Sequence, residues 1–394
     1  MAESSGKAFG RYMRTLRERR GLSLDDVRSL SQTFPETITK SYLSRCENGY
    51  HKLALAKLIP LSRIYEVPAD AVLERMELDL ELDRLGGSDT AAKGFAELAD
   101  AMRQLTEHGR RWEAYACARD ALACAAGDPV QSRYRDKREQ VALATLNVST
   151  MASSLGRNRY ALHEALCVLG DEALTSTNRA RTCDRVAVIY RRLALLDIAE
   201  QYSQQAIREA EAGHDFVGLA YMYSTRAHVA LSRSDPHSAI VLFHKSHSLH
   251  RDLGNVESAA AALVSVSECH LDLRRMRAAR RSCESALQLL QSEPRSLTRA
   301  TALAVMGKIV EAEGHVDQAV GFWQEAIEVA KEYRDRVLKF KIDLMLFRRA
   351  LSLGDGSSAR AIQRRLRRVS PWIPAELKEL TEFRELVRTG RTLT

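Results

Sequence analysis

Ser44-Arg45-Cys46-Glu47-Asn48-Gly49 is the stretch from which the rest of this chain can be interpreted. Thr39 is placed to cap a helix that begins at Lys40, because a threonine hydroxyl accepts a hydrogen bond from a free backbone N–H in the first turn. Leu43 and Cys46 share one apolar face of this helix, and the last two residues of the stretch tolerate the left-handed backbone that ends a helix. Basic and hydroxyl side chains occupy the other face, which is suited to the major groove of DNA.

The flanking sequence predicts a small bundle of helices around this one. Apolar residues at helical spacing predict a first helix over residues 6–20. A second helix should turn Val27 and Leu30 toward the core. A further apolar helix is expected over 55–67, and a short one near 71–73.

Over residues 7–73 the chain resembles the phage-repressor-like helix-turn-helix family. The matching segments are Phe9-Gly10, Met13-Arg14, Leu16-Arg17, Gly21-Leu22-Ser23, Tyr42-Leu43-Ser44-Arg45, Glu47-Asn48-Gly49 and Val67-Pro68-Ala69-Asp70 with Leu73. The chain departs from the family in two ways. The turn before Thr39 is about five residues longer than usual, through residues 31–36, and Arg28 replaces the small residue expected where the first two helices cross.

The resemblance implies that the outer face of the recognition helix contacts double-stranded DNA. The residues concerned are Lys40, Ser41, Ser44 and Arg45, with Thr39 and Tyr42 beside them. The alternative for each is an ordinary solvated helix face. Glu47 and Asn48 are expected to brace the end of the helix instead.

Charge and composition agree with a DNA-binding protein that works in the cytoplasm. Residues 1–65 carry a net charge of +6 and residues 360–394 one of +5, out of a total of +8. Positive side chains of this kind release counterions from DNA. No apolar run is long enough to span a membrane, and no signal-peptide core follows Met1, so export is not expected. The seven cysteines form no Cys-x-x-Cys pair and are expected to be buried thiols.

Behind the DNA-binding unit, residues 1–75, the sequence predicts a linker over 76–90 and a helical repeat domain over 91–394. Gly86-Gly87-Ser88-Asp89 marks the boundary. Small residues then recur at a step of forty, and one series consists of Ala199, Ala239, Ala279, Ala319 and Ala359. Four residues after the first four of these alanines stand Ser203, Phe243, Cys283 and Trp323. Small residues at fixed intervals let paired helices approach closely.

This pattern resembles tetratricopeptide repeats, although their usual step is shorter. The resemblance implies an all-α fold, in which the helix-turn-helix bundle is followed by a right-handed α-solenoid with a concave side. We expect about seven helix pairs and a capping helix near Ala375–Arg388.

The sequence contains no motif that points to catalysis or to a cofactor. No phosphate-binding glycine loop or nucleophile elbow occurs, so we expect neither an enzyme nor a bound cofactor. His244, His247 and His250 recur every three residues, but the third is rotated away from the first two. We therefore expect a solvated helix face there and no metal site.

A phage-repressor-like unit followed by tetratricopeptide-like repeats is similar to the bacterial peptide-pheromone receptors of quorum sensing. That resemblance implies a homodimeric transcription regulator whose repeat domain dimerises and senses a short peptide or a protein. Transferred by repeat position, the ligand-contacting residues are Asn147, Arg181, Arg185, Ser224, His228, Glu268 and Lys308. The alternative for them is an ordinary polar concave face. A second hypothesis is a protein-docking scaffold tethered to DNA, with no small ligand.

Overall fold

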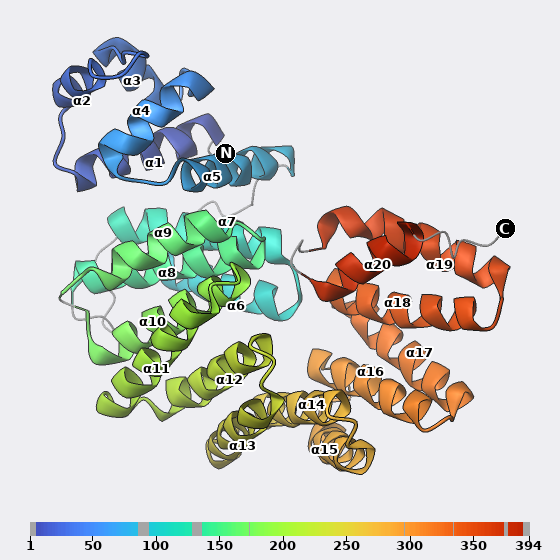
Figure 1. Ribbon diagram of the computed structural model, residues 1–394. Helices are drawn as coiled ribbons and strands as arrows, with labels where there is room; N and C mark the ends of the chain where they lie inside the picture. The colour runs from blue at the N-terminus through green and yellow to red at the C-terminus, as the bar shows by residue number, and fades with distance from the viewer. Residues whose placement is uncertain are drawn as a thin grey trace. The chain divides into compact units, whose positions relative to one another are not determined.

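Every regular element in the part of the chain described by the computed structural model is a helix, which confirms the predicted all-α class (Figure 1). The described residues are 5–85, 94–127, 136–172, 174–294, 296–333, 335–373 and 377–388. The predicted break at 86–89 and the first residues of the predicted capping helix lie outside these ranges. The chain divides into two compact units, residues 1–106 with 111–174, and residues 107–110 with 175–394.

Five helices form the N-terminal bundle, which we call the head. They are α1 (Ser5–Arg19), α2 (Leu24–Ser31), α3 (Lys40–Glu47), α4 (Leu55–Tyr65) and α5 (Ala69–Arg84). The caps follow from local sequence. Ser23 Oγ accepts a hydrogen bond from the Asp26 backbone N–H at 3.1 Å, and the Asp26 carboxylate accepts one from the Ser23 N–H at 2.7 Å. Thr39 Oγ1 accepts from the Tyr42 N–H at 3.2 Å, which confirms the predicted cap of α3.

Helix α5 is much longer than the short helix predicted near residues 71–73. It continues to Arg84, and its Leu78 and Leu82 are buried. The extension is stable because α5 packs against α9 of the same unit. Arg75 Nε donates to Asp79 at 2.8 Å, and Arg75 Nη1 donates to the Tyr160 hydroxyl at 2.8 Å. Residues 76–84 are therefore an ordered part of the first unit, and residues 86–90 of the predicted linker lie outside the described ranges.

In the described ranges, the helices after α5 can be grouped in chain order as seven consecutive pairs and a last single helix. They are α6 (Phe95–Glu107), α7 (Arg111–Gly127), α8 (Lys137–Ser154), α9 (Asn158–Leu169), α10 (Ser176–Arg192), α11 (Leu196–Ala212), α12 (Phe216–Ser232), α13 (Pro236–Asp252), α14 (Val256–Asp272), α15 (Met276–Leu289), α16 (Leu297–Ala312), α17 (Val316–Glu332), α18 (Arg336–Ser352), α19 (Gly356–Val369) and α20 (Lys378–Arg388). Short 3₁₀ turns follow α15 and α19, at Leu290–Ser292 and Ser370–Trp372. The first two pairs belong to the first unit.

Helix length explains the repeat step of forty. In the central repeats each helix has 17 residues, and a three-residue turn follows each one. The recurring alanines at 199, 239, 279, 319 and 359 are all fully buried. Between the paired helices α16 and α17, Gly307 leaves room for Trp323, because a Cβ on residue 307 would lie 2.2 Å from the indole Nε1. The periodic small residues therefore set how closely the paired helices pack.

Candidate functional site

The recognition helix α3 is held against α1 by a buried carboxylate. Glu47 is 3% exposed, and its two oxygens accept hydrogen bonds from Arg17 Nε at 2.7 Å and Arg17 Nη2 at 2.9 Å. Arg14 Nε approaches the same carboxylate at 3.4 Å, and Arg14 Nη2 donates to Asn48 Oδ1 at 2.8 Å. The expectation that Glu47 and Asn48 brace the end of the helix is confirmed.

The backbones of α1 and α3 also touch directly. A Cβ on Gly10 would lie 2.5 Å from the carbonyl oxygens of both Cys46 and Glu47, and only glycine avoids this clash. One turn earlier, Gly6 faces Gly49, whose φ of +75° is in the left-handed region. These glycines fix the distance between the two helices, and so they fix which face of α3 is presented to solvent.

That solvent face carries most of the predicted DNA-contacting side chains. Lys40, Ser41 and Arg45 are exposed, and Ser44 is half-buried. Lys40 Nζ donates to Asp25 at 2.6 Å in an exposed ion pair, which contributes little to stability and can open when a phosphate approaches. Arg45 Nη1 lies 3.4 Å from His51 Nε2. Thr39 is exposed beside them, and its hydroxyl accepts the hydrogen bond that caps α3.

Tyr42 has a structural position that the sequence did not indicate. Its hydroxyl accepts a hydrogen bond from the Ala54 N–H at 2.8 Å, and its ring stacks on His51 with the ring centroids 6.4 Å apart. The Lys57 ammonium lies 4.9 Å from the centre of the same ring. Tyr42 thereby ties α3 to the turn that leads into α4, and we expect it to position the DNA-facing surface.

The long turn before α3 is anchored at its end. Ile38 is 1% exposed, and its N–H donates to the buried Ser31 Oγ at 2.9 Å. Lys57 Nζ donates to the Thr37 carbonyl at 2.7 Å. The end of the long turn is therefore anchored directly before the cap of α3.

Two expectations for α2 are corrected. Leu30, predicted to face the core, is 45% exposed. Arg28 does not lie in the helix crossing but is exposed, and the small Ser31 is the buried side chain at that end of α2. The long turn instead contributes a core residue, Ile38, which is 1% exposed.

Sequence reasoning overlooked three exposed residues next to α3. Tyr50, His51 and Lys52 lie in the turn after the helix, and Tyr50 is 77% exposed. His51 stacks on Tyr42, and this places its Nε2 3.4 Å from Arg45 Nη1. A basic and aromatic turn beside a recognition helix is suited to phosphate contacts. The signal available in the sequence was the run of three such residues directly after Gly49.

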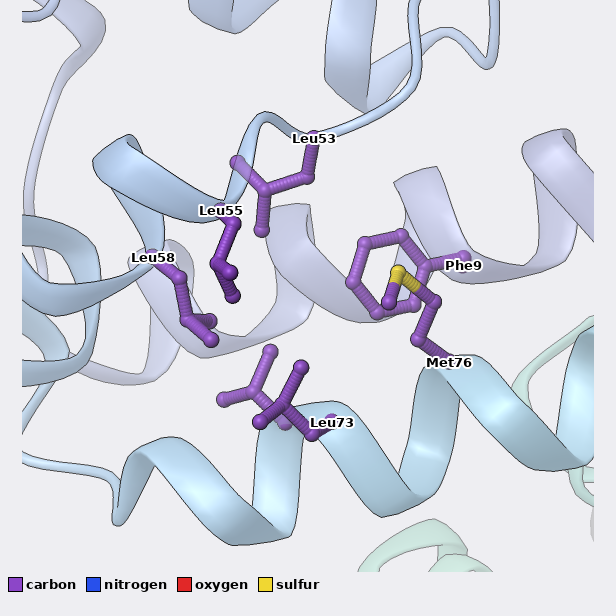
Figure 2. Close-up of a pocket in the computed structure, with 7 residues that line it drawn as sticks. Phe9, Leu53, Leu55, Leu58, Leu73 and Met76 are labelled. Carbon is purple, nitrogen blue, oxygen red and sulfur yellow. The ribbon is translucent and has the colours of Figure 1, made fainter.

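An apolar hollow lies on the head between α1, α4 and α5 (Figure 2). Its volume is about 40 Å³. It is lined by Phe9, Leu53, Leu55, Leu58, Val72, Leu73 and Met76, which supply no polar side-chain group except the thioether of Met76. Pockets for small molecules are usually several hundred Å³, so this hollow is a packing defect and is too small for an effector.

The predicted ligand residues lie on the first helices of successive pairs. Asn147 is on α8 in the first unit and is half-buried. The other six are in the second unit, namely Arg181 and Arg185 on α10, Ser224 and His228 on α12, Glu268 on α14 and Lys308 on α16. We call the parts of α10, α12, α14 and α16 that carry these six residues the first-helix surface. Arg181 Nη2 pairs with Asp215 at 3.2 Å, and Lys308 Nζ pairs with Glu268 at 3.3 Å.

Polar atoms on the first-helix surface are buried without a partner at α10. Arg185 Nε and Asp184 Oδ1 are both inaccessible to solvent and make no hydrogen bond. Burial lowers the pKa of Arg185 and raises that of Asp184. Unpaired buried polar atoms are rare in proteins and are costly. Such atoms are the places where the polar groups of a ligand can compensate the cost.

His228 on α12 is electrically neutral at ordinary pH. Burial, with the positive charges of Arg191 and Lys341, lowers the pKa of His228 to about 4. Its ring meets Phe243 edge-on, with the centroids 5.0 Å apart. His228 therefore offers a neutral imidazole, a hydrogen-bonding group without charge.

The histidine run on α13 differs from expectation. His250, expected on a solvated face, is 2% exposed, and its ring meets Tyr221 edge-on at 4.6 Å. His247 Nδ1 lies 3.0 Å from the Ala259 carbonyl. Among the described residues, no group of three or more His, Cys, Asp or Glu side chains is arranged to hold a metal ion.

The cysteines are mostly buried, as expected. Five of the seven are buried, but Cys124 is only half-buried and Cys167 is exposed. Within the described part of the chain, no helix is both long enough and apolar enough to cross a membrane.

Comparison with known proteins identifies the head. Residues 8–76 match the helix-turn-helix domain family, which agrees with the resemblance inferred from Tyr42 to Gly49. No curated protein matches the chain.

Solved structures with weak similarity include two complexes and one further protein. Bacillus thuringiensis PlcR in complex with the peptide PapR7 and DNA is 15% identical, over 72% of this chain and 94% of that chain, with a TM-score of 0.43. A Rap protein complexed with competence and sporulation factor is 14% identical, over 75% and 90%, with a TM-score of 0.49. Aspartyl phosphate phosphatase F from Bacillus subtilis is 14% identical, over 100% and 96%, with a TM-score of 0.48. These similarities concern the helical fold alone.

Proposed function

We propose that this chain, whose residues 8–76 match the helix-turn-helix domain family, is a sequence-specific DNA-binding transcriptional regulator. Its repeat domain dimerises and senses a peptide or protein effector. The protein has no catalytic role of its own and acts in the cytoplasm, where DNA is accessible.

The observation that carries the DNA-binding proposal is the way α3 is presented. Glu47 and Gly10 fix the inner face of the helix, while Lys40, Ser41 and Arg45 are exposed on its outer face, where Lys40 makes only an exposed ion pair with Asp25. A helix of this kind reads base edges through charged and hydroxyl groups near its start and middle. The exposed turn after α3 adds Lys52 for phosphate contact.

Selection of binding sites from random double-stranded DNA tests this proposal. We expect a sequence to be enriched, and gel-shift titration should then give an affinity that falls steeply with salt. Arg45→Ala should weaken binding to the selected site, whereas Lys331→Ala should not, because Lys331 is exposed on α17 and pairs with Glu328. Absence of any enriched sequence would contradict the proposal.

The effector proposal is supported by the first-helix surface. Arg185 and Asp184 leave buried polar atoms unsatisfied, and His228 is a neutral hydrogen-bonding group on α12. The backbone of an extended peptide carries alternating N–H and C=O groups that can satisfy such atoms. Asn147, on α8, has a side-chain amide that can likewise donate and accept hydrogen bonds. We propose the same ligand role for Arg181, Ser224, Glu268 and Lys308.

Thermal unfolding in the presence of fractionated culture extract tests the effector. Stabilisation by a low-mass fraction, lost on Arg185→Met, is the expected result. If no low-mass fraction stabilises the protein and another protein co-purifies with it instead, the chain is a DNA-tethered docking scaffold.

Dimerisation is proposed because two recognition helices read two half-sites and multiply specificity. The second unit exposes apolar side chains near the turns before α12 and α14, including Phe216, Val217, Leu253 and Val256. Tyr221 brings these two helix ends together, since its hydroxyl lies 3.2 Å from Asn255 Nδ2. Exposed apolar side chains gathered in one region favour a protein interface. Gel filtration with light scattering should give a dimer, and a monomer at micromolar concentration would contradict this.

A further inference from the structure

The outward side of α19 carries a row of arginines. The helix contains five arginines and no Asp or Glu. Its apolar side chains Ala359, Ile362 and Leu366 are buried in the core that α19 shares with α18 and α20 (Figure 1). At 3.6 residues per turn, the exposed arginines lie within an arc of about 100° on the other side of the helix. We call them the α19 basic face, and they are Arg360, Arg364, Arg367 and Arg368.

The arginines of the α19 basic face have no acidic partner within the described residues. The fifth arginine differs from them, because Arg365 Nη2 donates to the buried Asp343 at 2.8 Å. The nearby carboxylate of Asp355 caps the helix, accepting from the N–H groups of Ser357 and Ser358 at 3.1 Å. In the part of the chain that the structure describes, no ion pair joins the other four arginines to a carboxylate.

The stability of α19 does not account for this arrangement. Arg367 and Arg368 lie in the last turn, where the helix dipole favours positive charge. Arg364 is nearer the middle, four residues from both Arg360 and Arg368, and like charges at this spacing destabilise a helix slightly. The positive charge of the face is therefore not neutralised within the helix and is available to an anion outside it.

The composition of the α19 basic face favours the DNA backbone over a protein or a membrane. Guanidinium groups form bidentate hydrogen bonds with phosphate oxygens. The face is made of arginine, and α19 exposes no large apolar side chain. Protein interfaces need an apolar centre, and membrane-surface helices insert apolar side chains. From Arg360 to Arg368 the helix rises about 12 Å, a length over which duplex DNA carries about seven phosphates.

We propose that the α19 basic face binds the phosphate backbone of double-stranded DNA, independently of base sequence, as a second contact besides α3. This inference rests on the proposed DNA-binding function, because a chain held on DNA by its head meets phosphate at a high effective concentration. The second contact adds affinity for any sufficiently long duplex and leaves the choice of sequence to α3.

Salt titration of the DNA affinity of the full-length protein tests the inference. The duplex is long and lacks the selected site, and the logarithm of the affinity is plotted against the logarithm of the salt concentration. Each phosphate contact contributes about 0.9 to the slope, so loss of all four arginines should reduce the slope by about 3. Glutamine is the replacement, since it is uncharged and a good helix former. The quadruple variant is Arg360→Gln, Arg364→Gln, Arg367→Gln and Arg368→Gln.

Three comparisons separate a DNA contact from other effects of these substitutions. The unfolding midpoint of the quadruple variant should not fall, because its four side chains are exposed and repel one another. Lysine at the same four positions keeps the charge and should keep most of the slope. A dispersed control has the same net charge as the quadruple variant and should retain the wild-type slope. It changes four exposed residues outside α19, as Arg208→Gln, Arg233→Gln, Arg251→Gln and Lys331→Gln.

Each outcome distinguishes this inference from the proposed function. An unchanged slope in the quadruple variant, or an equal decrease in the dispersed control, would overturn the DNA contact at α19 and leave sequence selection by the head in place. Co-sedimentation with phosphatidylserine vesicles that is lost in the quadruple variant, with an unchanged DNA slope, would assign the face to a membrane and also overturn the inference. If the wild type binds neither the selected site nor the long duplex, the proposed function fails and this inference with it.

Discussion

Replacement of Gly10 by alanine should push α3 away from α1, because the two backbones touch at this residue. The new Cβ would lie 2.5 Å from the carbonyl oxygens of Cys46 and Glu47. Unstrained contacts to carbon are about 3.5 Å, so relief requires a movement of about 1 Å. Both oxygens belong to the backbone of α3, and no flexible side chain can absorb the overlap.

The expected magnitude combines two opposing effects. Overpacking costs about 1–3 kcal/mol, whereas the better helix propensity of alanine returns about 1 kcal/mol. The free energy of unfolding of the head should therefore fall by up to about 2 kcal/mol. A displaced recognition helix should also lose at least one charged contact to DNA, which is worth about 1–3 kcal/mol or about tenfold in affinity.

Two assays check this prediction. Gel-shift titration on the selected site measures the affinity, and hydrogen exchange with mass spectrometry measures the protection of α1 and α3. Gly321→Ala is the matched control, because Gly321 lies in α17 and a Cβ there meets nothing within 4 Å. That control should gain about 1 kcal/mol and keep the affinity of the wild type. Unchanged affinity and unchanged protection of α3 in Gly10→Ala would refute the reasoning.

Three further predictions concern the recognition helix, the contact between head and repeats, and pH. Arg45→Ala should cost about 1–3 kcal/mol of operator binding if the side chain reads a base; a gel shift equal to that of Lys331→Ala would remove this role. Arg75→Met should cost at most about 3–5 kcal/mol in urea unfolding, because the buried Asp79 loses both hydrogen bonds from Arg75 and keeps only the more distant Arg119, at 3.7 Å. Adding Asp79→Leu should recover part of that loss, and a larger loss in the double variant would contradict the explanation. The pKa of His228 is lowered from 6.5 to about 4, so unfolding takes up a proton, and the stabilisation present above pH 6.5 should be lost as pH falls toward 4. His228→Leu should make the unfolding midpoint depend less on pH between 6.5 and 4. If the pH dependence is the same as in the wild type, other groups control it.

The candidate site was predictable where it depends on local signals. Thr39 and the residues up to Gly49 specify a capped helix with a basic outer face, and the structure forms that helix from Lys40 to Glu47. The direction of Tyr42 was not predictable, because it depends on the turn at Ala54, which lies beyond the helix. Leu30 was assigned to the core by spacing alone, whereas the structure exposes Leu30 and buries Ile38 from the long turn.

The turns of the repeats show the same limit. Residues 194, 234, 274, 314 and 354 all have a left-handed backbone, at a step of forty. Only the last two are glycine, so a search for glycine finds only part of the series. The geometry of the helix pair imposes the conformation, and packing around the turn compensates the cost of about 1–2 kcal/mol at a residue with a Cβ.

The sequence by itself determined the helices, their caps, the repeat step and the basic face of α3, because these depend on residues within one or two turns of each other. Tertiary structure decided how far α5 extends, since the buried Arg75 donates to the Tyr160 hydroxyl, 85 residues away along the chain, and the buried Asp79 is paired with both Arg75 and Arg119. It also decided that Lys308 pairs with Glu268, 40 residues away along the chain. Charges interact through space whatever their separation along the chain, so their partners become known only once the helices are packed.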